Sequence, residues 1–305
     1  MTRTILFCIT LLLGTLSYAH EGDNFMESDM MTTMKPGDKA ALLMVHFGTT
    51  YDNTRALTID AINQKMAAAF PALTVREAWT SRIVMRRMKV RGEIKLTPTE
   101  ALNQLHKEGY THVVVQSTNI IEGIEMESLR TEVAGAEHLF KDIRIGNPLL
   151  YTVSDYRKVA AILAQYKPRE GAAVLVGHGT YTPSTSSYTM IDYMLKSEGY
   201  KNFYVGTIEG YPSFDDMLEQ LKHNGEKQVT LIPFMFVAGN HANNDIAVGW
   251  KQALEKVGLQ VSVRMQGLGE IPEIQQLFME HVRYMLTHKM INIMDKKKRY
   301  AAEKD

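Results

Sequence analysis

The chain has 305 residues, of which 45% are apolar, and it carries 34 basic and 34 acidic side chains. This is an ordinary globular composition, long enough for two modest domains or one large one. Because the formal net charge is zero, the composition gives no support to a nucleic-acid-binding protein.

The first residues have the pattern of an export signal. Arg3 precedes an apolar run over residues 5–13, and residues 17–19 (Ser-Tyr-Ala) then have the small-x-small form of a signal-peptidase site. The apolar run is shorter than the roughly 20 residues of a membrane-spanning helix. We therefore expect residues 1–19 to be a signal peptide cleaved after Ala19, a periplasmic location, and no integral membrane segment in the mature chain. Cys8, the one cysteine, would leave with this peptide, which excludes disulfides and cysteine catalysis.

The segments at the two ends of the remaining chain, residues 20–38 and 291–305, are predicted to be non-globular. Residues 20–38 are polar, rich in methionine and without a consistent period, so we expect a flexible tether; a soft-metal-binding tail is the alternative. Residues 291–305 are expected to form a basic, solvated tail, with contact to a membrane surface as the alternative.

From residue 40 onward, short apolar runs alternate with helical patterns, which is typical of a parallel α/β sheet. The predicted strands cover residues 41–47, 73–78, 112–116, 172–176, 203–208, 228–236 and 260–263. The predicted helices include residues 54–69, 98–108, 214–223 and 272–289.

An internal similarity divides this region into two halves. The segment "AALLMVHFGT" (residues 40–49) resembles "GAAVLVGHGT" (residues 171–180), and each is followed by a strand, a helix and another strand. We predict two similar α/β lobes, residues 39–148 and 149–290, each a parallel sheet flanked by helices; packing of the last helix on the N-terminal lobe is one option. Ligands of open parallel sheets bind outside the carboxyl ends of the strands, so the site is expected in the cleft between the lobes.

Three strand ends in the second half carry side chains that bind metals. His178 follows the strand at 172–176, Glu209 the strand at 203–208, and His241 the apolar run ending at residue 236. Two imidazoles and a carboxylate suit a borderline divalent cation such as cobalt, iron, nickel or zinc, and three protein ligands leave one position open. Taken singly, each of these residues is more typical of a loop cap, but together they predict a metal site.

Other residues are expected to contact the substrate. Gly177 and Gly239 lack a Cβ and would let a ligand approach closely. His46 ends its strand as His178 does and is expected to face the cleft from the opposite lobe. Arg82 and Arg86 stand four apart on a probable helix, as do Arg87 and Arg91. Each pair would bind carboxylates or form a solvated basic face, and Arg82 and Arg86 are the expected substrate contacts.

A series of motifs along the chain together resembles one known protein family. In chain order they are "ALLMVHFGT", "REAWTSRIVMRRM", "VVVQSTNIIEGIEME", "GHGTYTPSTSSY", "IEGYPSFDDML", "FVAGNHANNDIA" and "GLGE". Together they resemble the anaerobic sirohydrochlorin cobaltochelatases, the single-subunit class II chelatases of cobalamin biosynthesis, over nearly all of residues 39–290.

The resemblance implies two chelatase-type lobes with a tetrapyrrole between them and ATP-independent insertion of Co²⁺, or of Fe²⁺, into sirohydrochlorin. It makes His178, Glu209 and His241 the metal ligands, and we expect His178 or His241 to accept the displaced protons. Two positions depart from the family pattern: His46 stands where members usually have serine, and Asn119 replaces a histidine on the substrate-binding wall.

Two other functions remain open. An exported protein of this fold could bind haem, another tetrapyrrole or a metal and hand it on, with His46 as an axial ligand; the export signal motivates this alternative. A zinc hydrolase also uses two histidines and a glutamate, but the HExxH helix that usually supplies them is missing from the sequence. We expect a homo-oligomer, no nucleotide cofactor and no nucleic-acid partner.

Overall fold

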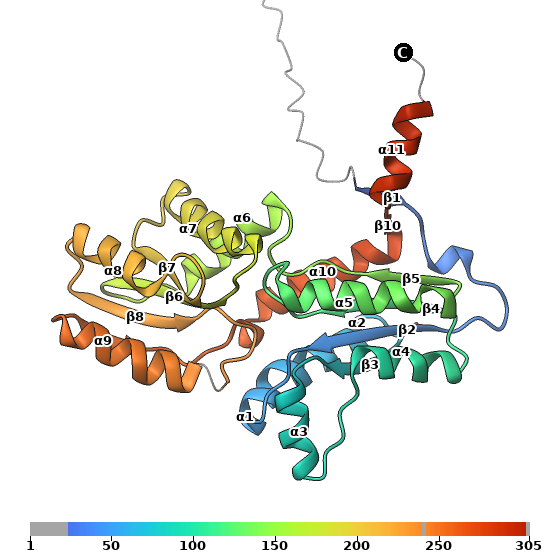
Figure 1. Ribbon diagram of the computed structural model, residues 1–305, viewed down its shortest axis with the longest axis horizontal. Coiled ribbons are helices and arrows are strands. Elements are labelled where there is room, and N and C mark those ends of the chain that lie inside the picture. Colours follow the sequence, from blue (N-terminus) through green and yellow to red (C-terminus); the bar gives the residue numbers. More distant parts are fainter. Residues whose placement is uncertain (1–23, 240–241, 303–305) are drawn as a thin grey trace, which may run out of the picture. The chain divides into compact units, whose positions relative to one another are not determined.

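The computed structural model describes residues 24–239 and 242–302 (Figure 1). The chain divides into a main unit, Glu27–Lys289, and a unit made of the terminal residues on either side of it. The expected signal peptide, residues 1–19, lies outside the described residues. Two four-stranded sheets belong to the main unit, which also holds the candidate site.

The first half of the main unit is built on a four-stranded parallel sheet with the order β3-β2-β4-β5. Its strands are β2 (Ala40–His46), β3 (Thr74–Trp79), β4 (His112–Ser117) and β5 (Asp142–Ile145). Its helices are α1 (Asp52–Arg55), η2 (Ala56–Asp60), α2 (Ala61–Ala69), α3 (Arg82–Val90), α4 (Pro98–Lys107), α5 (Ile124–Ala136) and η3 (Glu137–Leu139).

The second half repeats the plan, with the order β7-β6-β8-β9. Its strands are β6 (Ala172–Gly179), β7 (Phe203–Glu209), β8 (Gln228–Pro233) and β9 (Gln260–Val263). Its helices are α6 (Val153–Gln165), η4 (Pro183–Thr185), α7 (Ser186–Ser197), α8 (Phe214–His223), η5 (Ala242–Trp250), α9 (Lys251–Lys256), η6 (Leu268–Glu270) and α10 (Pro272–Thr287). The predicted fold class, two α/β lobes with parallel sheets, is confirmed.

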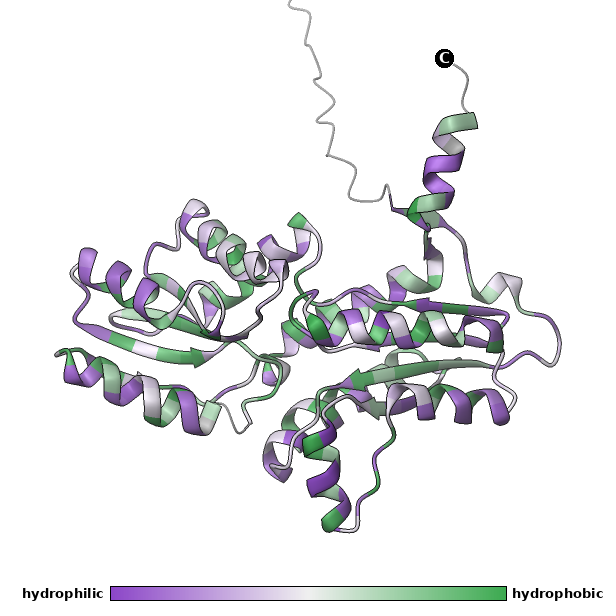
Figure 2. Ribbon diagram, in the orientation of Figure 1, coloured by the Kyte–Doolittle hydropathy of each residue, from purple (hydrophilic) through white to green (hydrophobic). Residues whose placement is uncertain are grey.

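The two central strands explain why each sheet forms. All seven residues of β2 are buried, as are the first six of β6, and Figure 2 shows the hydrophobic colour running along the central strands. Alternate residues of β2 face a core shared with α4 and α5, and alternate residues of β6 face a core shared with α8 and α9. Strands covered on both faces read as continuous apolar runs.

The strand order also fixes where a ligand can bind. In each sheet the first strand lies between the second and third strands of the same lobe, so the chain leaves β2 and β6 in one direction and later returns on the other side. Such switch points open a crevice at the carboxyl ends of the central strands. Here those ends belong to β2 and β4 in one lobe and to β6 and β8 in the other.

Helix α10 contacts both lobes and so connects them in addition to the covalent linker. It packs against α6 and also against β4 and α2 of the first lobe. His281 in its middle lies with Nε2 3.1 Å from an Asp155 carboxylate oxygen and with Nδ1 3.3 Å from the Asn147 carbonyl. These contacts tie the linker between the lobes to the last long helix.

The segment expected as a tether is folded where the structure describes it. Strand β1 (Phe25–Glu27) pairs with β10 (His288–Met290), and η1 (Met31–Thr33) follows. Met30 is fully buried, and the amides of Ser28 and Met30 donate to carbonyls at the end of α10. The expectation of a flexible tether is therefore wrong for these residues, because apolar and backbone groups in them find partners on α10.

The tail also contains a helix, α11 (Ile293–Ala302), which lies in the terminal unit. Within the part of the chain that the structure describes, no helix is both long and apolar enough to cross a membrane.

Candidate metal centre and substrate pocket

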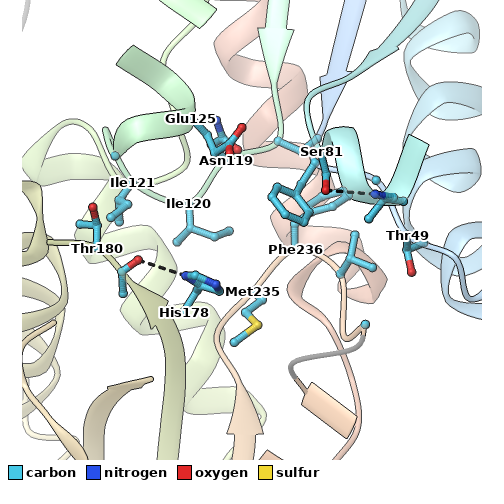
Figure 3. A pocket seen from close by; sticks show the side chains of 18 of the residues that line it. Thr49, Ser81, Asn119, Ile120, Ile121, Glu125, His178, Thr180, Met235 and Phe236 are labelled. Carbon is cyan, nitrogen blue, oxygen red and sulfur yellow. Dashed lines mark hydrogen bonds between the residues drawn. The ribbon is translucent and has the colours of Figure 1, made fainter. Parts of the chain in front are cut away.

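A pocket of about 410 Å³ lies at the carboxyl ends of both sheets, within the main unit (Figure 3). This volume is in the range of small-molecule sites, roughly 300–1,000 Å³. The first lobe lines it with the loops that follow β2, β3 and β4, and the second lobe with those that follow β6, β7 and β8. A pocket thus lies where the site is expected from the sequence, between the lobes at the strand ends.

His178 and Glu209 enter the pocket from neighbouring strands. They lie at the penultimate residue of β6 and the last residue of β7, which pair in parallel with Gly179 opposite Glu209. Gly179 has a φ of +88°, and a Cβ built on it would lie 1.4 Å from the Glu209 carbonyl oxygen. Only glycine fits such a close approach in this backbone conformation. The glycine after His178 thus lets the two strand ends, and the imidazole and carboxylate they carry, share one edge of the sheet.

Gly177 serves a different purpose from the expected contact with substrate. It is absent from the described pocket lining, and a Cβ on it would meet the Tyr188 ring at 2.2 Å. The buried Tyr188 side chain packs there, and its hydroxyl accepts from the Gly179 amide at 3.2 Å. Burial raises the pKa of Tyr188 to about 12, so the phenol stays neutral. Tyr188 supports the backbone that carries His178.

The turn after Glu209 is held on both sides. The Thr207 amide and hydroxyl both donate to the Pro212 carbonyl, at 2.7 and 2.9 Å. The Thr185 hydroxyl accepts from the Tyr211 amide and donates to the Tyr211 carbonyl, each at 3.0 Å. These bonds fix the backbone around an exposed carboxylate.

His241 and its neighbour Asn240 lie outside the described residues. The loop before them is well anchored: the Phe234 amide donates to the Val176 carbonyl at 2.8 Å, and the amides of Leu268 and Gly269 donate to carbonyls of that loop at 2.8 and 2.9 Å. Gly239, two residues before His241, lines the pocket. Among the described residues there is no group of three or more His, Cys, Asp or Glu side chains that could hold a metal ion.

The wall across from His178 carries Asn119 and Glu125 (Figure 3). The Asn119 side-chain amide nitrogen is buried and finds no hydrogen-bond partner among the described residues. Glu125 stands in the first turn of α5. Glu125 is not among the residues predicted from the sequence, although its place in "IIEGIEME", just beyond a strand end, is a signal that could have indicated it.

His46 lies beneath the pocket wall and does not line it. Its side chain is 1% exposed, with Nδ1 3.0 Å from the Thr118 hydroxyl and Nε2 3.0 Å from the Asn63 carbonyl oxygen. Burial is the main cause that lowers the pKa of His46, which keeps the imidazole neutral. Both ring nitrogens are therefore engaged within the protein, unlike the expected contact with a tetrapyrrole.

The internal similarity explains this position. When residues 40–49 are set against 171–180, His46 matches Gly177, and Phe47 matches His178. Phe47 and His178 both line the pocket, whereas His46 and Gly177 do not. Because side chains along a strand alternate between faces, a shift of one residue sends a side chain to the other side.

The basic helix α3 contributes one cation to the pocket. Arg87 lines it, together with Ile83 and Val84. The expected Arg82 and Arg86 are exposed and do not belong to the described lining. The pocket-facing arginine thus belongs to the pair Arg87 and Arg91, not to the pair expected to contact the substrate.

Comparison with known proteins gives the family. Residues 40–287 match the family described as "Cobalt chelatase (CbiK)". This chain belongs to the cobalt chelatase family. The sirohydrochlorin cobaltochelatase of Salmonella typhimurium is 34% identical over 256 residues, which cover 81% of this chain and 97% of that protein. The sirohydrochlorin cobaltochelatase CbiKC of Nitratidesulfovibrio vulgaris is 30% identical over 257 residues, covering 81% and 90%.

Solved chelatase structures share the fold. SirB from Bacillus subtilis subspecies spizizenii, a sirohydrochlorin chelatase determined in complex with cobalt, superposes with a TM-score of 0.59 at 16% identity, covering 81% of this chain and 95% of that one. SirB from Bacillus subtilis with Fe³⁺ gives a TM-score of 0.58 at 17% identity, covering 81% of this chain and 96% of that one. At this sequence identity, the structural similarity supports the two-lobed chelatase fold only.

Proposed function

We propose that this chain is a metal chelatase that inserts Co²⁺ into sirohydrochlorin without ATP, in cobalamin or a related tetrapyrrole biosynthesis. The observation that carries the proposal is the pocket between the lobes. His178 and Glu209 reach it from adjacent strand ends and Glu125 from the opposite lobe, in a chain of the cobalt chelatase family. Fe²⁺ is the second metal to compare.

The metal ion enters as a substrate. His178 supplies an imidazole nitrogen and Glu209 a carboxylate oxygen, and such mixed donors suit borderline divalent ions. We assign His241 as the third ligand, because the anchored loop before it delivers Gly239 to the same pocket. Three protein ligands leave a coordination position for exchange.

The reaction exchanges a cation for protons. The metal ion and the metal-free ring give the metallated ring and two protons, which leave the pyrrole nitrogens. His178 and His241 become available as proton acceptors once the ion has moved from them to the ring. Glu125, on the opposite wall, offers a second acceptor for the other face of the macrocycle.

The remainder of the pocket suits a flat ring with acidic edges. Ile120, Ile121 and Phe236 present apolar surface to the cavity. Arg87 is the one Lys or Arg among the described lining residues and is positioned to bind a carboxylate of the substrate.

The haem-binding alternative receives no support from the position of His46. An axial bond to a haem iron would require His46 to leave both Thr118 and Asn63 and to reach past the pocket wall. We therefore retain the chelatase as the conclusion.

The deciding experiment is metal insertion into sirohydrochlorin, followed by absorbance, with Co²⁺ and Fe²⁺ compared. His178→Ala and His241→Ala should each abolish most of the insertion rate, whereas His223→Ala, an exposed histidine on α8, should not change it. A wild-type protein that inserts neither metal, or histidine variants that retain the wild-type rate, would contradict the proposed function.

We also infer that the protein acts in the periplasm, on the basis of the signal-like residues 1–19. Expression of the full chain with fractionation and N-terminal sequencing tests this inference. The expected result is a periplasmic protein that begins at His20; a cytoplasmic protein that retains Met1 would contradict it.

A further inference from the structure

A chain of buried hydrogen bonds leads from the pocket wall into the first lobe. Thr118 is a buried residue of the pocket lining, and its hydroxyl lies 3.0 Å from His46 Nδ1. His46 Nε2 lies 3.0 Å from Asn63 Oδ1. Asn63 Nδ2 then donates to Glu77 at 3.0 Å, and Glu77 accepts from Lys95 at 2.7 Å. Each link has ordinary hydrogen-bond length.

The direction of these bonds can be read from the Glu77 end. Burial by itself would raise the pKa of Glu77, but the Lys95 ammonium and the other groups around the carboxyl hold it below its ordinary value. An ionised carboxylate only accepts hydrogen bonds, so Asn63 must turn its NH₂ group toward it. The Asn63 carbonyl oxygen then faces His46, and His46 Nε2 must carry the proton.

The tautomer of His46 fixes the hydroxyl of Thr118 in turn. A neutral imidazole protonated at Nε2 has an unprotonated Nδ1, which can only accept. The Thr118 hydroxyl therefore donates to Nδ1. Its competing acceptor, the Val45 carbonyl, lies farther away at 3.4 Å. With its hydrogen directed into the protein, the Thr118 oxygen keeps acceptor capacity on a residue that lines the pocket.

We propose that His46 is a positioning residue that fixes Thr118 as a hydrogen-bond acceptor, and that Thr118 accepts from a pyrrole N–H of the metal-free macrocycle. This inference rests on the proposed function, since it takes the macrocycle to be the ligand. The metallated ring has no pyrrole N–H, so Thr118 favours binding of the substrate over the product. The chain from Glu77 to Thr118 thereby sets which form of the ring the pocket retains.

Binding measurements test this selectivity without turnover. Metal-free sirohydrochlorin and cobalt-sirohydrochlorin are titrated separately into the wild type, Thr118→Val, Thr118→Ser, His46→Phe and the variant carrying both Thr118→Val and His46→Phe. Loss of one hydrogen bond should weaken metal-free binding about 5-fold in Thr118→Val and His46→Phe, leave binding of the cobalt form unchanged, and be largely reversed by serine. Because the two residues act as one unit, the double variant should lose no more than either single variant.

The matched controls lie elsewhere in the two sheets. His112 is also buried and hydrogen-bonded to a threonine, at the opposite end of the first sheet, and Thr230 is a buried threonine of β8. His112→Phe and Thr230→Val should lower stability without changing the preference for the metal-free ring. Equal weakening of both ring forms in Thr118→Val, or multiplied effects in the double variant, would overturn the proposal.

The tautomer provides a second readout that needs no ligand. NMR of the ¹⁵N-labelled histidine rings at neutral pH should show His46 protonated at Nε2 and unprotonated at Nδ1, with His46→Phe serving to assign the signals. A proton on Nδ1 would overturn the positioning role. If the wild type binds the metal-free ring selectively but inserts no metal, the proposed function fails and this inference stands; if it binds neither ring, the inference fails as well.

Discussion

Gly179 and Glu209 face each other at the ends of two parallel strands, with room for no side chain at position 179. The close approach lies directly between the two described metal-binding candidates, His178 and Glu209. Backbone packing at this point therefore determines whether an imidazole and a carboxylate can act on the same ion.

Replacing Gly179 by alanine should damage both stability and metal binding. The Cβ would overlap the Glu209 carbonyl, and the positive φ adds strain, so we expect a loss of roughly 2–5 kcal/mol in the free energy of unfolding. Gly199→Ala is the control, because it has a φ of +94° but open space around it, and should lose only roughly 1–2 kcal/mol. Urea unfolding and cobalt titration measure the two effects; equal losses in both variants would count against the close approach as the cause.

The two pocket glutamates should separate into different roles. Glu209→Gln should raise the Kd for cobalt about 10-fold or more, because a charged ligand is lost. Glu125→Gln should leave the cobalt Kd unchanged and slow insertion about 100-fold, in the range of a lost general base. Cobalt titration and single-turnover insertion separate these effects, with the exposed Glu127→Gln as control. An altered cobalt Kd in Glu125→Gln would argue for a role in holding the ion.

Arg87 should contribute to recognition of the acidic substrate more than its neighbour on α3. Arg87→Ala should raise the KM for sirohydrochlorin about 10-fold, since hydrogen bonds to charged groups contribute roughly 1.5–3 kcal/mol before solvent screening. The exposed Arg86→Ala should change the KM by less than about 2-fold. Equal effects of both substitutions would indicate a general attraction by the basic helix face.

His46 should make stability depend on pH in a definite direction. Its pKa is lowered in the folded protein, chiefly by burial, relative to about 6.5 in the unfolded chain. Below pH 6.5 the unfolded state binds the proton and the folded state does not, so stability falls as the pH drops toward the folded pKa, by at most about 1.4 kcal/mol per pH unit.

Urea unfolding of the wild type and of His46→Phe between pH 5 and 8 checks this dependence. The wild type should lose stability relative to His46→Phe as the pH falls below 6.5. Above about pH 7.5 the difference in stability between the two proteins should stay constant. Parallel pH curves would show that the buried His46 network does not govern this titration.

The strand pattern could be predicted from the sequence because fully covered strands are apolar throughout. The helix at 214–223 and the strand at 260–263 match α8 and β9 in the structure. Strand β5 was missed, since "DIRI" places a buried arginine and an aspartate in a short strand. The predicted strand at 228–236 was too long: its pairing with β6 ends with the bond from the Phe234 amide to the Val176 carbonyl, and the chain bends at residues 235–237.

The site was less predictable from the sequence because it depends on which side chains face the cavity. Strand ends identified His178 and Glu209 as pocket residues, and their roles as metal ligands remain predictions. His46 looked equivalent to His178, but a shift of one residue turns it toward Asn63. The roles expected for Gly177, Arg82 and Arg86 depended on the same kind of orientation, which only packing of neighbours such as Tyr188 decides.

Residues that precede the family-matched region, among them Ser28 and Met30, contact the folded main unit. The Arg144 side chain is buried, and its guanidinium donates to the Ser28 carbonyl at 2.7 Å and to the Met285 carbonyl at 2.9 Å. A recombinant chain cut at residue 40, where similarity to the chelatases begins, would remove Ser28 and Met30 and leave a cationic group short of acceptors beside the end of α10. The boundary found by homology is therefore not the boundary of the folded protein, and expression should begin upstream of residue 27.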